Sequence, residues 1–290
     1  MKRSIFGESV QGTSHQVVGM ECQDSMEWCQ PDDETVIMAV ADGHGSKSSP
    51  FSKTGSTIAV NVFCDVMSEF YEVYKENLDQ LMTFLNREGE IKIGQAIDGK
   101  WNKRVLRAHR RKKRAVPLTS DGKKDKESIY RLYGSTIVGL MITSIFIFAF
   151  RIGDGELTYV DNEGMEQLLL QDRILGTETH SLGKIDSWKK AVSEVHRKNV
   201  SNHLPSMFML STDGFYNSHI NDDEFNKSCV EYFAMLKQHG QQLISDNLKN
   251  WLSETSSQGC GDDITLLIAF FDEEDTSVLE DLDSLEKHEN

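Results

Sequence analysis

The sequence Val36-Ile37-Met38-Ala39-Val40-Ala41-Asp42-Gly43-His44-Gly45 joins a run of apolar residues to an acidic turn. A short apolar run that stops at glycines is typical of a buried strand entering a tight turn. Such a turn would carry Asp42 and His44 to the rim of a sheet, where a carboxylate and an imidazole can act on a molecule bound from solvent. Asp-Gly is also an ordinary turn pair, so one copy of the pattern would say little about function.

The same pattern of an apolar strand beside an acidic turn returns three times. It is found at Ile152-Gly153-Asp154-Gly155, at Leu210-Ser211-Thr212-Asp213-Gly214 and, in mirror order, at Gly261-Asp262-Asp263 before Ile264. Carboxylates that arrive from separate strand ends repel one another unless a cation lies among them. Oxygen ligands without cysteine favour Mg²⁺ or Mn²⁺ over zinc or copper. Two such ions can hold a phosphoryl group and activate water, so the pattern predicts phosphate hydrolysis.

The composition argues against several classes of protein. The chain has 290 residues, of which 38% are hydrophobic and 27% charged, as in one large or two small globular domains. The net charge of -15 argues against binding to nucleic acid or to an anionic membrane. Five cysteines without a Cys-x-x-Cys pair, and an N-terminus without an apolar segment, predict a cytoplasmic protein, which we expect to be a monomer. The most apolar stretch, Ile137 to Phe150, is shorter than the roughly 20 residues of a spanning helix.

The periodicity of apolar residues predicts strands and helices in separate runs. The strands around residues 134–160 follow one another too closely for helical crossovers, so we expect an α+β domain with largely antiparallel sheets. The basic run 110–114 and the residues up to 126 are expected to form a solvated loop, residues 12–24 a loop, and residues 171–206 a long loop or flap. Strands are predicted at 3–10, 36–41, 135–143, 145–152, 156–160, 207–211 and 264–271, and helices at 51–77, 78–87, 93–109, 221–237 and 241–255.

Six motifs, taken in order, resemble the metal-dependent serine/threonine phosphatases of the PP2C family. They are Cys22-Gln23-Asp24-Ser25, Val40-Ala41-Asp42-Gly43-His44-Gly45, Gly134-Ser135-Thr136, Ile152-Gly153-Asp154-Gly155, Ser211-Thr212-Asp213-Gly214 and Gly261-Asp262-Asp263-Ile264-Thr265. The resemblance covers about residues 4–271, and the form Cys-Gln-Asp together with Gly176-Thr177-Glu178-Thr179 is more similar to the bacterial branch.

The resemblance implies a four-layer α-β-β-α sandwich of two mainly antiparallel sheets flanked by helices. This phosphatase domain would span residues 1–271, and residues 272–290 would be an acidic tail without fixed structure. The implied reaction is hydrolysis of phosphoserine and phosphothreonine in proteins, by a water or hydroxide activated between two Mn²⁺ or Mg²⁺ ions. Phosphoprotein substrates are therefore the expected partners.

The resemblance also assigns metal ligands. Asp42 would bridge both ions, and the carbonyl of Gly43 would bind one of them. Strand geometry allows only one of Asp262 and Asp263 to face the site readily, and the family register favours Asp262. Asp24 matches one member of the family's acidic pair, and Asp154 matches an acid that helps hold a third, weaker metal in many bacterial members. The implied ligands are Asp24, Asp42, Gly43, Asp154, Asp213 and Asp262.

Three further residues receive roles beside the metals. His44 matches the residue proposed as general acid for the leaving oxygen, a task that suits imidazole near neutral pH; the alternative is a turn histidine that only hydrogen-bonds a neighbouring acid. Gln23 stands where relatives have an acid and would orient water. Many relatives carry an arginine ahead of the first acid pair to grip the phosphate, but residues 10–24 contain neither Arg nor Lys, which leaves His15 as the basic candidate.

Two other functions remain open at this point. A pseudophosphatase or regulatory binding domain would keep the fold without turnover, although Asp42, Asp213, Asp262 and His44 together argue against it. A metal-dependent hydrolase of other phosphate esters, such as nucleotide phosphodiesters, would commonly add histidine ligands, and His44 is the only histidine within a strand-end motif. A substrate panel and a turnover assay distinguish these alternatives.

Overall fold

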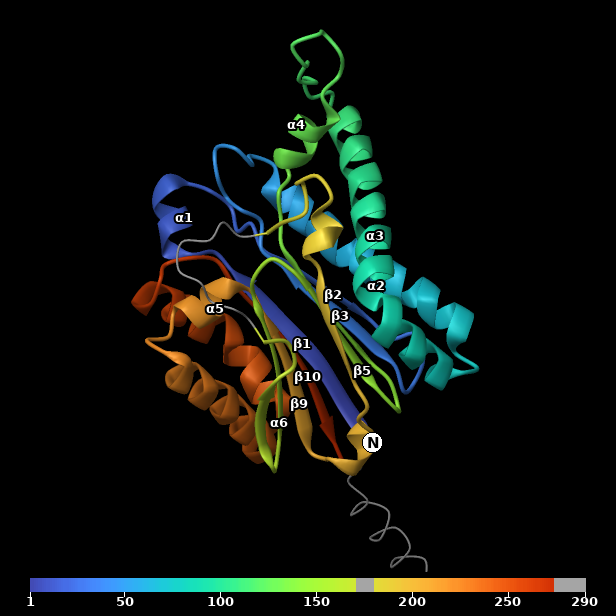
Figure 1. The fold of residues 1–290 in the computed structure, drawn as a ribbon. Coiled ribbons are helices and arrows are strands. Elements are labelled where there is room, and N and C mark those ends of the chain that lie inside the picture. Colours follow the sequence, from blue (N-terminus) through green and yellow to red (C-terminus); the bar gives the residue numbers. More distant parts are fainter. Residues whose placement is uncertain (171–179, 274–290) are drawn as a thin grey trace, which may run out of the picture.

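The protein, described by a computed structural model over residues 1–170 and 180–273, is built in four layers (Figure 1). Two antiparallel sheets of five strands lie in the middle, in the orders β1-β10-β9-β6-β7 and β2-β3-β4-β5-β8. This arrangement confirms the predicted α-β-β-α sandwich. The strands are β1 Lys2–Val10, β2 Ser25–Cys29, β3 Val36–Ala41, β4 Ile137–Ile142, β5 Ile147–Ile152, β6 Glu156–Asp161, β7 Gly164–Gln167, β8 Val192–His196, β9 Ser206–Ser211 and β10 Ile264–Asp272.

Helices cover the outer face of each sheet. The long helices α2 (Ser52–Tyr74) and α3 (Leu78–Arg111) pack on the sheet that contains β3, and α6 (Asp222–Gln258) packs on the sheet that contains β1. The shorter elements are α1 Thr13–Val18, α4 Lys126–Arg131, α5 Asp213–Asn217 and the 3-10 turns η1 Ser187–Lys190 and η2 Val200–Asn202. Within residues 1–170 and 180–273, none of the helices combines the length and the apolarity of a membrane span.

Three hydrophobic clusters fill the three interfaces between the layers. Along β3, Ile37, Ala39 and Ala41 belong to the cluster under α2 and α3, whereas Val36, Met38 and Val40 belong to the cluster between the sheets. Successive side chains of a strand point to opposite faces, so a strand that is covered on both faces must be apolar throughout. The unbroken apolar run before Asp42 follows from this burial. A third cluster lies between the other sheet and α6.

Several predicted boundaries differ from the structure. The two helices predicted at 78–87 and 93–109 are one helix, α3, because Gly89 does not break it but brings it close to the ring of Phe148. The loop predicted at 12–24 contains α1, and the flap predicted at 171–206 contains β8, which pairs with β5 as an edge strand. The helices predicted at 221–237 and 241–255 meet at Gly240, whose φ of 73° interrupts α6.

Other predictions fall partly outside the described residues. The motif Gly176-Thr177-Glu178-Thr179 and most of the acidic tail, from residue 274 onward, lie there. The basic run is not wholly a solvated loop, since Arg110 and Arg111 end α3 and the Arg114 guanidinium carbon lies 3.3 Å from the centroid of the Phe51 ring.

The contact between α2 and β4 gives a first prediction. Gly139 of β4 faces Phe63 so closely that a Cβ would lie 2.2 Å from the ring, whereas a Cβ on Gly99 of α3 would meet nothing within 4 Å. We expect Gly139→Ala to lower the free energy of unfolding by about 1–3 kcal/mol through overpacking. The matched variant Gly99→Ala should raise it by about 1 kcal/mol, since alanine favours a helix interior. Urea unfolding measures both, and a neutral Gly139→Ala would contradict this packing.

Candidate active site

Three carboxylates meet at one end of the sandwich. Asp42 follows β3, Asp154 follows β5, and Asp213 begins α5 directly after β9. An oxygen of each lies within 4.8 Å of an oxygen of the others. Since β3 and β5 belong to one sheet and β9 to the other, the cluster lies where the ends of both sheets come together. The structure therefore brings together three of the acids that the sequence analysis selected.

Glycines place two of these acids. Asp154 lies between Gly153 and Gly155, whose φ values of 105° and 107° are strained for any side chain with a Cβ. Gly43 follows Asp42 where the chain passes between the loop of Gln23 and the start of α2, and a Cβ there would lie 2.8 Å from the carbonyl oxygens of Gln23 and Ser52. The glycines beside the acids thus allow a positive φ on either side of Asp154 and a close approach of the backbone after Asp42.

Asp24 adds a fourth carboxylate from the buried interior. Its Oδ2 accepts a hydrogen bond of 2.6 Å from the hydroxyl of Thr212, and its Oδ1 is buried and has no hydrogen-bond partner among the described residues. Burial raises the pKa of Asp24 to about 7, and the nearby charges of Asp263 and Asp262 act in the same direction. A buried, unsatisfied carboxylate oxygen is costly unless a proton or a cation binds it.

The charges of the cluster act on one another. Burial raises the pKa of Asp42 well above its ordinary value, and repulsion by Asp24, Asp213, Asp262 and Asp154 raises it further. The pKa of Asp213 is raised well above its ordinary value by burial and then by Asp154 and Asp262. Clustered acids whose ionised forms are disfavoured by burial and by mutual repulsion form a suitable site for a hard divalent cation, which neutralises the carboxylates. The residues present therefore fit a metal centre.

Asp262 and Asp263 are separated as strand geometry requires. Asp263 is buried, and its two oxygens accept hydrogen bonds from the backbone N–H of Gly12 at 2.7 Å and of Gln23 at 2.6 Å. Asp262 is more exposed, and its charge raises the pKa of the clustered acids. The side chain of Asp263 thus joins the final strand to two loops, and Asp262 remains the candidate ligand.

His15 and Gln23 have structural partners. The Nδ1 of His15 lies 2.9 Å from Oδ1 of Asp263, so this histidine supports the same junction, and its phosphate-binding role stays a prediction. The Oε1 of Gln23 accepts hydrogen bonds from the Ser52 hydroxyl at 2.7 Å and the Lys53 N–H at 3.0 Å, while its Nε2 donates to the carbonyl of Glu21 at 2.6 Å. The oxygen of the amide is engaged at the start of α2 and its nitrogen in the loop of Glu21, and the role of orienting water stays a prediction.

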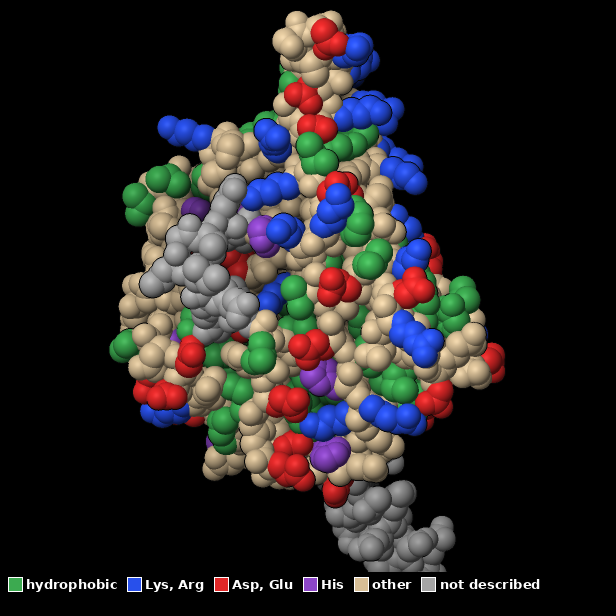
Figure 2. All heavy atoms as spheres, viewed as in Figure 1, with side chains coloured by type: hydrophobic (Ala, Val, Ile, Leu, Met, Phe, Trp, Pro, Cys, Tyr) green, Lys and Arg blue, Asp and Glu red, His purple; other side chains and the backbone are tan. Residues whose placement is uncertain are grey.

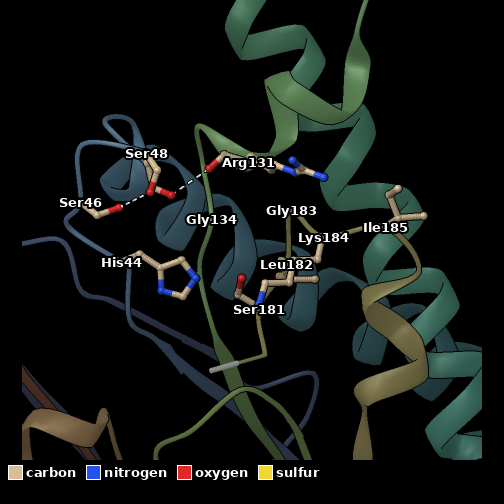
Figure 3. A pocket seen from close by; sticks show the side chains of 11 residues that line it. His44, Ser46, Ser48, Arg131, Gly134, Ser181, Leu182, Gly183, Lys184 and Ile185 are labelled. Atoms are coloured by element: carbon tan, nitrogen blue, oxygen red, sulfur yellow. Dashed lines mark hydrogen bonds between the residues drawn. The ribbon is translucent and has the colours of Figure 1, made fainter. Parts of the chain in front are cut away.

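His44 follows Asp42 by two residues and lies on the wall of a cavity. Its backbone N–H donates to the carbonyl of Gly134 at 3.3 Å, and a Cβ on Gly134 would come within 2.7 Å of the imidazole Cδ2. Figure 3 shows the ring facing the cavity from the loop that follows Asp42, opposite the segment that carries Ser181 and Leu182. The cavity has a volume of about 660 Å³. The candidate general acid is therefore next to a space that could hold part of a substrate.

A second cluster of possible metal ligands lies elsewhere in the described chain, and its side chains are less suited to bind a metal. Oxygens of Asp161 and Glu163 and a nitrogen of His203 lie within 4.8 Å of one another. However, Asp161 accepts hydrogen bonds from Tyr159 and from two backbone N–H groups, and the ammonium of Lys198 lies 3.8 Å from its Oδ2. These donors already satisfy the carboxylate.

Sequence reasoning missed the hydroxyls and the acid that hold the ligands in place. The Thr136 hydroxyl accepts from the backbone N–H of Asp42 at 2.9 Å, and the Thr212 hydroxyl accepts from the N–H of Thr265 while it donates to Asp24. Both threonines stood inside selected motifs, so the position of a hydroxyl beside each acidic turn was the available signal. Strand geometry had marked Asp263 as the acid that faces away from the site, but its partners carried no such signal, since only the fold brings the loops of Gly12 and Gln23 to it.

The α-β-β-α sandwich has carboxylates clustered where the ends of both sheets meet, and these acids fit a divalent metal centre. The sequence matches the family model of protein phosphatase 2C over residues 11–253. The chain therefore belongs to the protein phosphatase 2C family. A search of curated proteins gives no match.

Solved structures share the fold at low sequence identity. A bacterial serine phosphatase superposes with a TM-score of 0.60 at 12% identity, covering 94% of this chain and 99% of that chain. A serine/threonine phosphatase of S. agalactiae gives 0.53 at 14%, covering 93% and 100%. The catalytic domain of the serine/threonine protein phosphatase PstP, solved with two manganese ions, gives 0.52 at 11%, covering 93% and 99%. At such identity the similarity establishes the fold.

The two adjacent acids give a second prediction. Asp263→Asn should lower the free energy of unfolding by about 1–3 kcal/mol, because an amide cannot accept from both loop N–H groups and its NH₂ would face a donor. Asp262→Asn should cost little stability but weaken Mn²⁺ binding, since it removes a charge from the cluster. Chemical unfolding and isothermal titration with Mn²⁺ measure the two effects. Normal stability of Asp263→Asn with lost metal binding would reverse the assignment.

The raised pKa of Asp24 gives a third prediction, for the protein in chelator. The folded chain holds this proton up to about pH 7, whereas the group ordinarily releases it near pH 3.8, so stability is lost as the pH rises through that window. The loss from Asp24 alone is at most about 4 kcal/mol. Added Mn²⁺ should reduce this loss, because it binds the deprotonated acids. Thermal unfolding from pH 4 to pH 8, with and without Mn²⁺, tests this, and an Mn²⁺ effect independent of pH would contradict it.

Proposed function

We propose that the protein hydrolyses phosphoserine and phosphothreonine in phosphoproteins with the help of two Mn²⁺ or Mg²⁺ ions. The observation that carries the proposal is the cluster of Asp42, Asp154 and Asp213, whose oxygens lie within 4.8 Å of one another beside a cavity lined by His44. Membership of the protein phosphatase 2C family supports the same reaction.

The chain supplies ligands from both sheets for these cations. Asp42, the carbonyl of Gly43, Asp213, Asp262 and Asp24 would hold the two ions, and Asp154 would hold a third. When bound, the cations would neutralise the phosphoryl oxygens and lower the pKa of the attacking water. Hydroxyl groups keep the ligands in place, because the N–H of Asp42 donates to Thr136 and the carboxylate of Asp24 accepts from Thr212.

The imidazole of His44 would donate a proton to the leaving oxygen of the substrate. A serine or threonine alkoxide is a poor leaving group, so a proton at this oxygen lowers the barrier. The backbone of His44 is fixed by its hydrogen bond to Gly134, and the ring faces the cavity in Figure 3. The substrate side chain would therefore enter from the cavity, with its phosphate toward the carboxylates.

The test is hydrolysis of phosphoserine and phosphothreonine peptides with and without Mn²⁺. We expect turnover that chelator abolishes and Mn²⁺ or Mg²⁺ restores, and no hydrolysis of phosphodiesters. Phosphodiester hydrolysis in place of peptide hydrolysis would establish a different esterase, and metal binding without any turnover would establish a regulatory domain.

Substitution of His44 provides the second arm of this test. His44→Ala should reduce turnover of phosphopeptide about 10²-fold or more, but should affect nitrophenyl phosphate far less, since its leaving group needs no proton. His239→Ala, an exposed histidine of α6, is the matched control and should be neutral. Equal losses of His44→Ala on both substrates would assign His44 to the support of the metal ligands.

A further inference from the structure

The charged side chains that line the cavity beside His44 are basic, as far as the described residues go. Its polar lining consists of Arg131, Lys184, His44 and four serines, and the remaining lining residues are glycine or apolar. None of the described residues that line it is acidic, although the chain has 46 acidic and 31 basic residues. A cavity with cations and hydroxyl donors favours an anion.

Three segments from different parts of the chain build this cavity. The loop of Ser46, Ser48 and Ser49 follows the acidic turn, Gly134 precedes β4, and the segment 181–185 lies opposite (Figure 3). The Ser49 hydroxyl donates to the carbonyl of Arg131 at 2.8 Å, so the loop is fastened to the end of α4. The wall that carries Arg131 is thus tied directly to the loop that carries His44.

Arg131 is held by its backbone while its guanidinium stays available. It is the last residue of α4, and its carbonyl also accepts from the N–H of Gly134 at 3.3 Å. Its side chain is exposed and forms no ion pair within the described residues. The hydrogen bonds of Asp125 with Ser128, where it caps the other end of α4, are the main cause of its lowered pKa, and the charge of Arg131 contributes least. Figure 3 shows the guanidinium extending above the segment of Lys184.

Basic side chains also gather around this part of the surface. In Figure 2, Lys and Arg side chains collect in the upper part of the face shown, below the tip of the molecule, whereas carboxylates are more frequent in the lower part. The reaction centre itself is strongly acidic, with Asp42, Asp154 and Asp213 close together. A basic wall next to this centre would attract a second anionic group while the first anionic group, the substrate phosphate, meets the metals.

We propose that this cavity binds an anionic side chain close to the phosphorylated residue of the substrate, with Arg131 as a specificity-determining residue. The inference rests on the proposed phosphatase activity. Neighbouring residues of an extended peptide are about 3.3–3.6 Å apart along the chain, so a residue within a few positions of the phosphoserine can reach past His44. The anion is either a carboxylate of Asp or Glu or a second phosphate, which present similar oxygens to a guanidinium.

The experiment compares phosphoserine peptides that differ only in the flanking residues. One series carries Glu at the flanking positions and the other carries the isosteric Gln, and kcat/KM is measured with Mn²⁺ for both. We expect the Glu series to be preferred about fivefold at low ionic strength, as for a partly exposed ion pair, and the preference to shrink in added salt. A third series with a non-hydrolysable phosphonate side chain distinguishes a second phosphate from a carboxylate.

Variants of Arg131 then assign the preference. Arg131→Ala should remove the preference for Glu and leave hydrolysis of nitrophenyl phosphate unchanged, and Arg131→Glu should favour a Lys-flanked peptide. Arg107→Ala, an exposed arginine of α3 outside the cavity, is the matched control and should keep the preference. If Arg131→Ala fails to fold, the preference of the wild-type enzyme and its salt dependence still decide the question.

The outcomes separate this inference from the proposed function. Equal kcat/KM for the Glu and Gln series, with clear hydrolysis of both, would overturn the inference alone. A preference that survives Arg131→Ala would overturn the assignment to Arg131, as would a loss of activity that is equal on peptides and nitrophenyl phosphate. Failure to hydrolyse any phosphopeptide would overturn the proposed function itself.

Discussion

Repulsion among clustered carboxylates is the constraint on which the rest of the structure depends. Asp24 is buried and Asp42 and Asp213 are half-buried, and desolvation together with mutual repulsion raises the pKa of each. Such an arrangement destabilises the folded chain unless protons or cations neutralise it. The three apolar interfaces of the sandwich supply the stability that the cluster removes, since the strands that end at the acids are buried on both faces. The same repulsion would favour the binding of divalent cations among these acids.

The number of hydrogen bonds that each carboxylate accepts distinguishes the acids that anchor the fold from those that could bind a cation. Both oxygens of Asp263 accept from backbone N–H groups of loops near the start of the chain, and one of them also faces His15. By contrast, Asp24 accepts through Oδ2 from Thr212, while its buried Oδ1 has no hydrogen-bond partner in the described part of the chain. A carboxylate with all its donors supplied gains little from a cation, whereas one with an open buried oxygen gains much. Replacing a fully hydrogen-bonded acid such as Asp263 should therefore destabilise the fold. Replacing an acid with an open oxygen, such as Asp24, should weaken metal binding.

Local patterns predicted a largely antiparallel α+β domain with acids at the strand ends, and the resemblance to the PP2C family implied the four-layer sandwich. The run Val36 to Ala41 predicted a strand covered on both faces, and the acids at the strand ends marked one rim of the sheets. Contacts between distant segments were not predictable in this way. The Oε1 of Gln23 accepts hydrogen bonds at the start of α2, and Gly89 lets α3 pass close to the ring of Phe148. Arg131 belonged to no motif, so only the folded chain brings it to the cavity of His44.

The contrast between the acidic cluster and the basic cavity bears on how an acidic protein can act on an anionic substrate. A chain with a net charge of -15 repels phosphoproteins at long range, and salt screens this repulsion over about 8 Å at physiological ionic strength. Within that distance the local charges matter most, and Arg131 and Lys184 are the charged side chains that line the cavity of His44 among the described residues, apart from the imidazole itself. The cations at the cluster would hold the phosphate, and the cavity wall would hold its anionic neighbour. Recognition would thus depend on two adjacent anions, and a phosphorylated residue without an anionic neighbour would engage only one of the two positive regions.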